Sequence, residues 1–340
     1  MDYKSLPGTN QSILKKILDH PKDYLKAKER QESSDESSEE HFVFGSMVDM
    51  MLLSTKAEFD AKFSRIPDDV KCSDTIKAIV LGVFEGVKDI GEIKDFSDYS
   101  DLILSHCQYQ NYQPNWKEDT KVNKVIEQGT AYFNILCKGI NKILVTETEY
   151  ANAVSCLMAL KADAFTRPYV DKKFDKNNVE FWDRFIIQFV HNGRAIKGEL
   201  DRVIVNHTKK TITPVDFKTT GKTIKGFKYD FWQYRYDFQA AVYKLGVLAH
   251  PDVIALLNQG YTLQNFVYCV VEKNLIYNPM NFVVSSAVDN IGLYGGFRSN
   301  GQEVEGFFAA CARLDFAEAN DAWEYPMEYY QLEGATYLEV

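Results

Sequence analysis

Between residues 179 and 219, apolar and polar side chains alternate in a way that predicts three neighbouring β-strands. The first segment, residues 179–190, is rich in aromatic and β-branched residues. Asn192 and Gly193 follow it, and this pair favours a tight hairpin turn because both residues tolerate a positive φ angle. A second polar turn, at residues 207–210, separates the next two segments. The pattern therefore predicts a three-stranded meander.

Apolar residues at helical spacing flank this meander on both sides. Near the start, residues 9–12 precede apolar positions at 13, 14, 17 and 18, which is typical of a capped amphipathic helix. Residues 42–53 are strongly apolar and suit a buried helix, in which Asp49 is the one charged member. Three later elements are also expected: a helix over 231–248, an apolar strand over 266–271 and a helical stretch at about 301–317.

These elements predict an α/β fold with a central mixed sheet flanked by helices. We expect one domain over residues 1–340. The stretch 65–145 looks mainly helical and carries no chemical motif, so we interpret it as a helical insertion that serves as scaffold, lid or subunit contact. The segment 32–40 is acidic and of low complexity, and we expect a mobile loop there.

Composition places the chain among ordinary globular proteins. It has 340 residues, 45% of them hydrophobic and 26% charged, and can bury a large core. No segment reaches the roughly 18 apolar residues of a membrane helix, and the start has no apolar signal region. We therefore expect a cytoplasmic protein without a membrane partner. The six scattered cysteines form no Cys-x-x-Cys pair, which argues for reduced thiols and against a zinc or iron–sulfur site.

The net charge of −9 argues against a general nucleic-acid binder, which would be basic. One local cluster of lysines, Lys218, Lys222, Lys225 and Lys228, departs from this balance. It suits either a channel for a polyanion or a solvated loop.

The two turns place candidate catalytic residues opposite one another. Centring the hairpin on residues 207–210 sets Asp201 opposite Asp216 and Glu199 opposite Lys218, all on one face. Opposed like charges weaken a sheet, and a divalent cation bound between the two carboxylates would remove that cost. A lysine beside such a cation can polarise a water or a phosphate. This combination indicates phosphodiester hydrolysis.

Three short motifs follow one another at a familiar spacing: Gly198-x-x-Asp201, Asp216-x-Lys218 and Gln239-x-x-x-Tyr243. They resemble the motifs of the PD-(D/E)xK nucleases of the RecB-like branch, and most of all the RecE and lambda-exonuclease type of phage recombination nuclease. Thr219 and Thr220 extend the match after the lysine. The i, i+4 spacing of the glutamine and the tyrosine puts both on one helical face.

The opening of the chain agrees with this resemblance. Residues 10–14 and 20–24 are similar to the Ser-x-Leu … Ser-Pro-x-x-Tyr start of the RecE-like proteins, and residues 44–49 resemble their Gly-x-x-x-His segment. Here Asp49 stands where a histidine is usual. An aspartate also binds magnesium, so the departure bears on the set of ligands. The resemblance covers residues 1–55 and about 179–330.

The resemblance implies a restriction-endonuclease-like fold and a metal-dependent mechanism. Asp201 and Asp216, with the carbonyl of Phe217, would bind one or two Mg²⁺ ions, and Mn²⁺ is expected to substitute. Lys218 and the metal would position and deprotonate the attacking water, with Gln239 and Tyr243 completing the catalytic set. Asp49 and Glu180 are candidate further ligands; an exposed strand glutamate is the alternative for the latter.

The same resemblance, with the local charge, suggests residues that contact DNA: Lys222, Lys225, Arg202, Thr219 and Thr220. Arg202 and Arg184 have a second interpretation, which is cross-strand pairing with Asp183 or Asp201. For Glu199 we favour an ion pair with Lys218 over a role as ligand.

The function that the resemblance implies is a Mg²⁺-dependent 5′→3′ exonuclease on double-stranded DNA ends, leaving 3′ single strands for recombination. It also implies a homo-oligomeric ring, a single-strand-annealing partner, a bacterial host and a phage origin. A RecB-type or CRISPR-adaptation nuclease is the alternative, although such proteins often carry four clustered cysteines, which this chain lacks. A DNA-binding relative without turnover is the third hypothesis.

Overall fold

The computed structural model describes residues 3–32, 40–67, 70, 72–273 and 276–335, with the backbone alone for residues 32 and 40–42. The acidic segment expected as a mobile loop therefore lies almost entirely outside the described residues. Contacts divide the chain into two compact units. One comprises Met1–Gly45 with Cys156–Val340, and the other is Ser46–Ser155. That the chain forms a single nuclease domain with a helical insertion therefore remains a prediction.

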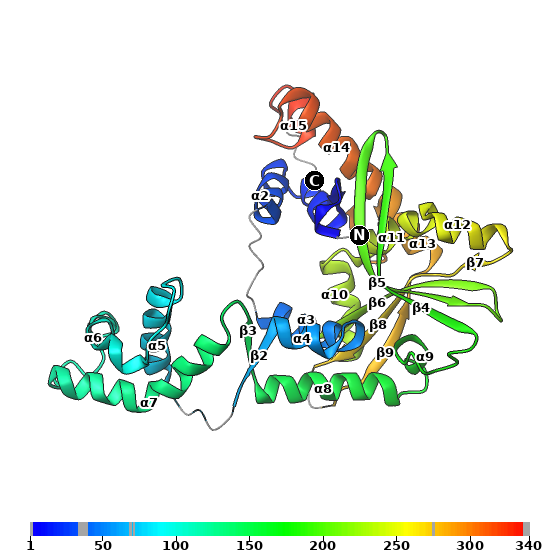
Figure 1. The fold of residues 1–340 in the computed structure, drawn as a ribbon. Coiled ribbons are helices and arrows are strands. Elements are labelled where there is room, and N and C mark those ends of the chain that lie inside the picture. The colour runs from blue at the N-terminus through cyan, green and yellow to red at the C-terminus, as the bar shows by residue number, and fades with distance from the viewer. Residues whose placement is uncertain (1–2, 33–39, 68–69, 71, 274–275, 336–340) are drawn as a thin grey trace. The chain divides into compact units, whose positions relative to one another are not determined.

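The first unit is built on a mixed sheet whose longest strands form the predicted meander (Figure 1). These strands are β4 (Val179–His191), β5 (Arg194–Asn206) and β6 (Thr211–Thr220). Asn192 and Gly193 both have positive φ, at 48° and 79°, so the expected tight turn is present. The remaining strands of this sheet are β1 (Thr9–Asn10), β7 (Thr262–Leu263), β8 (Val267–Glu272) and β9 (Pro279–Val283).

The register of the second hairpin is the one that the sequence predicts. β5 and β6 pair antiparallel from Asn206↔Thr211 to Arg202↔Val215, and the pairing ends there, one position before Asp201 and Asp216. Beyond that point β6 pairs in parallel with β8, whereas β5 pairs in parallel with β1 near its own start. The same edge of β5 thus pairs with β6 over residues 202–206 and with β1 at residues 196–197. Asp201 and Asp216 lie just beyond the last β5–β6 pair.

Helices cover this sheet and bury its apolar side chains. α11 (Tyr236–Ala249) packs its apolar residues with those of β4, β5 and β8 in one core, and its Phe238 and Val242 belong to a second core with α1 (Gln11–Leu14) and α14 (Phe307–Asn320). The sequence predicts one helix over 231–248, and this is wrong. The chain forms α10 (Phe227–Gln233) and then α11, because Arg235 between them takes a left-handed conformation with φ 57°.

The start of the chain is a short helical segment, as expected. The side chain of Asn10 accepts a hydrogen bond from the backbone N–H of Ile13 at 2.9 Å and caps α1. The helix continues as a 3₁₀ turn, Lys15–Leu18, and α2 (Pro21–Glu32) follows. The other elements of this unit are α9 (Arg167–Val170), α12 (Pro251–Asn258), β10 (Gly296–Phe297), β11 (Glu303–Val304), α13 (Ser286–Tyr294) and α15 (Met327–Gln331).

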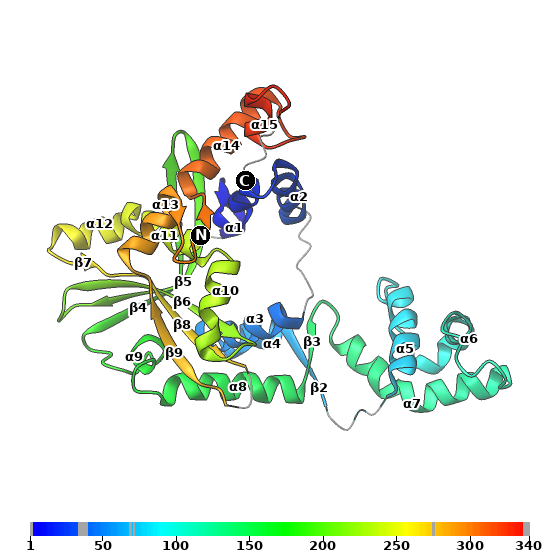
Figure 2. The same cartoon turned by 180° about the vertical axis from the view of Figure 1, so that it is seen from behind.

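The second unit is mainly helical, as the sequence predicts. Its core is formed by α5 (Asp74–Val87), α6 (Ser100–Tyr109) and α7 (Glu118–Lys138), whose apolar faces pack together. A parallel pair that the sequence did not predict, β2 (Phe63–Ile66) and β3 (Ile143–Thr146), joins the two ends of this stretch. The unit also holds α4 (Lys56–Lys62) and parts of α3 (Glu40–Leu53) and α8 (Glu147–Ala162), labelled in Figures 1 and 2.

The fold is mixed α/β, a central mixed sheet with many helices, and the predicted fold class is confirmed. Among the described residues, no single helix is both long and apolar enough to cross a membrane; α11 and α12 meet the length and composition criteria only as a pair bent by 71°.

Candidate active site

Asp216 and Lys218 project from β6 on the face that α11 covers. Strand residues two apart share a face, and Asp216 is only 2% exposed. Its Oδ1 accepts a hydrogen bond from the Nε2 of Gln239 on α11 at 3.3 Å. Its Oδ2 forms an ion pair with the ammonium of Lys218. The amide of Gln239 and the ammonium of Lys218 thus both hold the buried carboxylate.

Asp201 is bound to the backbone of the neighbouring strand. Its Oδ2 accepts a hydrogen bond from the backbone N–H of Phe217 at 2.6 Å. Because the β5–β6 pairing has ended, this side chain satisfies a strand N–H that would otherwise lack a partner on that side. The same contact brings the Asp201 carboxylate close to Asp216.

The proximity of the two acids appears in their electrostatics. Burial, followed by the negative charge of Asp216, raises the pKa of Asp201 to about 7. Lys218 and the Phe217 N–H act in the opposite direction without cancelling that effect. The raised pKa means that the ionised form of Asp201 is disfavoured beside Asp216. Additional positive charge at this site would therefore stabilise the two carboxylates.

Lys218 supplies some of that charge. Burial by itself lowers the pKa of Lys218, but the carboxylates of Asp216 and Asp201 outweigh it, and the net shift is upward. The lysine is therefore held as an ammonium, 5.2 Å from the centre of the Tyr236 ring and 5.9 Å from that of Tyr268. In this form it can orient a water or a phosphate oxygen.

Gln239 and Tyr243 lie one turn apart on α11, as their spacing predicts, and each is 8% exposed. The Oε1 of Gln239 lies 3.3 Å from the hydroxyl of Tyr268, so its amide group is oriented with the nitrogen toward Asp216. Burial raises the pKa of Tyr243, which also hydrogen-bonds Gln239. A Cβ at Gly198 would lie 2.8 Å from the Tyr243 ring. This glycine, the first residue of the Gly-x-x-Asp motif, therefore allows α11 to approach β5 closely.

Arg184 lies opposite Asp201 on β4 and has an unusual backbone conformation. Its φ is +48° in the middle of a strand, and the pairs on either side of it, Asp183↔Arg202 and Phe185↔Leu200, are regular. Such left-handed residues are costly and gather at functional sites. Its Nη1 lies 3.3 Å from Glu199 Oε1. The expected ion pair between Glu199 and Lys218 is therefore wrong, because each has another partner.

Arg202 lies away from any surface that DNA could reach. Its side chain is fully buried, and its Nε donates to Asp183 Oδ1 at 2.6 Å. The guanidinium lies over the rings of Phe181 and Phe217, 4.7 and 5.3 Å from their centres. The cross-strand alternative is thus the correct one, and the expected contact between Arg202 and DNA is wrong.

Glu180 and Thr220 also have other partners. Glu180 pairs with Val205, four strand positions from Asp201, which is roughly 13 Å along the strand. Its carboxylate contacts His207 Nε2 at 3.1 Å, so its expected role as a ligand beside Asp201 is wrong. The buried hydroxyl of Thr220 donates to Asp230 Oδ2 at 2.9 Å, which excludes the expected contact with DNA from this position.

The loop after β6 keeps its two candidate lysines at the surface. Lys222 is exposed and forms an ion pair with Asp230, and Lys225 is exposed. Between them, the backbone N–H of Ile224 donates to the buried Glu272 at 2.7 Å and fixes the loop. Roles in DNA binding for these lysines and for the half-buried Thr219 stay predictions, as does the Phe217 carbonyl as a ligand. So does Asp49, which lies on α3 in the second unit.

Lys15 is a site residue that the sequence did not reveal. Its Nζ donates to the carbonyl of Tyr234 at 2.8 Å. Burial, and then the nearby charges of Lys16, Arg235 and Lys218, lower its pKa to about 8. No motif contains Lys15, and only the fold brings the 3₁₀ turn after α1 to the site.

Within the described ranges, no group of three or more His, Cys, Asp or Glu side chains is arranged to hold a metal. The pair Asp201 and Asp216 nevertheless fits a hard divalent cation. Both offer carboxylate oxygens, and the raised pKa of the first shows that added positive charge would be favourable. Magnesium commonly takes one or two carboxylates and fills its other positions with water and phosphate oxygens.

Fold and site together define an α/β protein in which a pair of carboxylates, a lysine and a helix-borne glutamine meet where the pairing of two neighbouring strands ends. Residues 121–287 of the chain match the family model described as the PD-(D/E)XK nuclease superfamily. The matched stretch contains Asp201, Asp216, Lys218 and the Gln-x-x-x-Tyr helix. The chain therefore contains a PD-(D/E)XK nuclease superfamily domain.

Among solved structures, the chain is similar to a protein described as "Putative exonuclease" from Eubacterium rectale. The two share 12% sequence identity with a TM-score of 0.31, over 69% of this chain and 77% of the other. No curated protein matches the sequence.

Proposed function

We propose that this protein is a nuclease that cleaves DNA with the help of a divalent metal ion. The observation that carries the proposal is the meeting of Asp201, Asp216, Lys218 and Gln239 where the β5–β6 pairing ends. The match of this stretch to the nuclease superfamily model supports it.

Asp201 and Asp216 would hold the metal, and Mg²⁺ suits them best. When bound, the ion would supply Lewis-acid stabilisation of charge on the phosphate and lower the pKa of a bound water. Phe217, through its carbonyl, and Asp49 are proposed further ligands. Mn²⁺ is expected to substitute for Mg²⁺.

The protein side chains have separate tasks in this proposal. The Lys218 ammonium orients the attacking water or a phosphate oxygen and offsets the charge that develops there. Gln239 fixes the direction of the Asp216 carboxylate, and Tyr268 and Tyr243 in turn fix the glutamine amide. Lys222, Lys225 and Thr219 contact the DNA backbone.

The finer activity is a 5′→3′ exonuclease on double-stranded DNA ends that leaves 3′ single strands for recombination. The motifs from Gly198 to Tyr243 support this choice by their resemblance to RecE and lambda-exonuclease proteins. A homo-oligomeric ring and a single-strand-annealing partner are part of the same proposal and rest on that resemblance alone.

Incubation with end-labelled linear DNA and with covalently closed circles, in Mg²⁺ and in EDTA, tests the proposal. We expect Mg²⁺-dependent degradation of linear DNA only, with label lost first from the 5′ end. Nicking of circles would instead support an endonuclease of the RecB type. An absence of turnover on both substrates, with binding retained, would contradict a nuclease and support a DNA-binding relative.

A further inference from the structure

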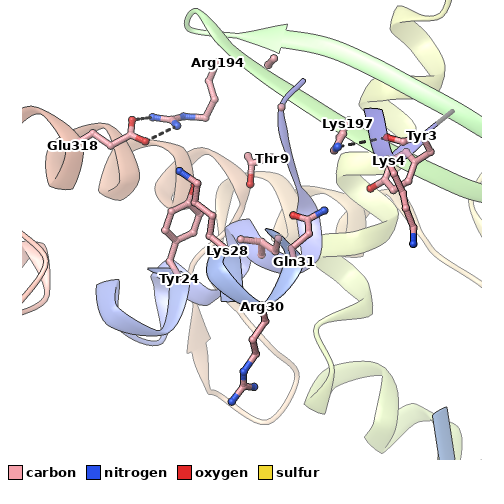
Figure 3. A pocket seen from close by; sticks show the side chains of 13 residues that line it. Tyr3, Lys4, Thr9, Tyr24, Lys28, Arg30, Gln31, Arg194, Lys197 and Glu318 are labelled. Atoms are coloured by element: carbon pink, nitrogen blue, oxygen red, sulfur yellow. Dashed lines mark hydrogen bonds and ion pairs between the residues drawn. The ribbon is translucent and has the colours of Figure 1, made fainter. Parts of the chain in front are cut away.

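A cavity of about 870 Å³ lies in the first unit, outside the carboxylate site (Figure 3). Its walls come from the start of the chain, from α2, from the beginning of β5 and from α14. The charged side chains among the described residues that line it are almost all basic: Lys4, Lys28, Arg30, Arg194 and Lys197, with Glu318 as the one acid. A chain with a net charge of −9 thus concentrates positive charge in one hollow.

The most informative of these cations is Lys197 on β5, which is only 5% exposed. Its Nζ donates to the backbone carbonyls of Leu6, at 2.7 Å, and Tyr3, at 3.4 Å, and lies 5.1 Å from the Tyr3 ring centre. These acceptors are neutral, and within the part of the chain that the structure describes no carboxylate forms an ion pair with the Lys197 ammonium. A buried charge without a counter-charge favours the approach of an anion.

Arg194 differs from Lys197 in its partners. Its guanidinium is bidentate to Glu318, at 3.2 and 2.6 Å, and also contacts Asp315 on the same helix. Figure 3 shows this pair on one wall and Lys28 beside Tyr24 on another. Arg194 therefore fastens β5 to α14, and the lysines provide the positive charge of the cavity.

Two chain segments connect the cavity to the carboxylate site. Lys197 precedes Asp201 by four residues on β5, roughly 13 Å in an extended strand. Ile13 lines the cavity, and Lys15, two residues later, reaches the site near Lys218. A polymer with regularly spaced negative charges could therefore occupy both places at once.

We propose that this cavity binds internal phosphodiester groups of one DNA strand, at a distance of a few nucleotides from the bond that is cleaved. The inference rests on the proposed nuclease function. The basic lining suits the phosphate groups of such a strand.

The test compares Lys28→Glu with Lys26→Glu. Both lysines are exposed on α2 and both substitutions change the charge equally, but only Lys28 lines the cavity. Binding of a fluorescein-labelled single-stranded 20-nucleotide probe is measured in EDTA at several salt concentrations, with a 5′-hydroxyl and with a 5′-phosphate. Cleavage is measured in Mg²⁺.

For Lys28→Glu we expect binding about tenfold weaker and a salt slope smaller by about 0.7, the value for one lost phosphate contact on a single strand. The effect should be equal for both 5′ ends, with KM raised and kcat unchanged. Lys26→Glu should behave as the wild type. Equal slopes for the two variants, or an effect confined to the 5′-phosphate probe, would overturn the inference. A wild type that binds but does not cleave would overturn the proposed function and leave the cavity assignment standing.

Discussion

At the scale of single residues, the site is a balance of charge around two acids. Asp216 is held by Gln239 and Lys218, whereas Asp201 is held by a backbone N–H and retains a proton up to about pH 7. The sequence identified these four residues because their spacing is local or follows a motif. It could not identify Lys15 or the buried state of Arg202, since both depend on which distant segments pack nearby.

Removing the amine of Lys218 tests its role in the reaction. We expect Lys218→Ala to lower kcat by about a thousandfold or more, because a preorganised charge at the reacting phosphate is lost. Single-turnover cleavage of labelled DNA measures this, and circular dichroism checks the fold. Lys228→Ala, an exposed lysine outside the site, is the control. Rates close to wild type in the first variant would remove Lys218 from the catalytic set.

Asp201 gives the metal-free protein a specific dependence on pH. Its carboxyl titrates near 4 in an unfolded chain and at about 7 in the folded protein, so between these values only the folded protein keeps the proton. The stability from this group is therefore complete below about pH 4 and is lost as the pH rises through 7.

Urea unfolding in EDTA between pH 4 and 8 measures this effect. Asp201→Asn cannot lose the proton, so its free energy of unfolding should rise relative to wild type as the pH increases across that range. Parallel curves for the two proteins would show that the carboxyl has its ordinary pKa.

At the scale of elements, the contact between β5 and α11 sets the geometry of the site. The strand periods and the turn residues at 192–193 and 207–210 predicted the meander and its register, because those signals are local. The break between α10 and α11 was missed, since no glycine or proline marks it and an arginine adopts the left-handed conformation there. The β2–β3 pair was missed because it joins residues about 80 positions apart.

A methyl group at Gly198 should disturb this contact. In Gly198→Ala the new Cβ would lie 2.8 Å from the Tyr243 ring and 3.2 Å from Ile187, so α11 must shift. We expect a loss of about 1–3 kcal/mol in stability, typical of overpacking, with a lower kcat because Gln239 moves with the helix.

Thermal unfolding and cleavage rates measure both effects. Gly91→Ala is the matched control, because a Cβ there meets nothing within 4 Å. The double variant Gly198→Ala with Tyr243→Ala should lose less stability than the sum of the losses in the two single variants, because the ring that clashes with the new methyl group is gone. If the double variant is as unstable as the sum of the two single variants, the steric explanation fails.

At the scale of the whole molecule, composition predicted a globular protein with reduced cysteines. All six are free; Cys107, Cys156, Cys269 and Cys311 are buried, and Cys72 and Cys137 are half-buried. Burial raises the pKa of Cys156 to about 12, which suppresses the reactive thiolate. Mixed α/β architecture could be predicted because it follows from element types, whereas the bounds of the two compact units could not, since they depend on which helices pack together.

The thiols offer a measurement on the intact protein. With a colorimetric disulfide reagent at pH 8, we expect only Cys72 and Cys137 to react quickly, and the four buried thiols to react at the rate of unfolding. Reductant should leave the melting temperature unchanged. Rapid modification of all six, or a lower melting temperature in reductant, would contradict this description.

The bond from the Phe217 amide to Asp201 has a consequence for how the site can vary. One carboxylate spaces two strands and, in the proposed function, also presents charge to the metal ion, so neither property could change independently. Lengthening the side chain by one carbon, as in Asp201→Glu, would push the neighbouring backbone aside and displace Asp216 with it. Substitutions of Asp201 should therefore be as poorly tolerated by the fold as by the reaction. A second mutation that restores activity to such a variant should lie in β6 itself.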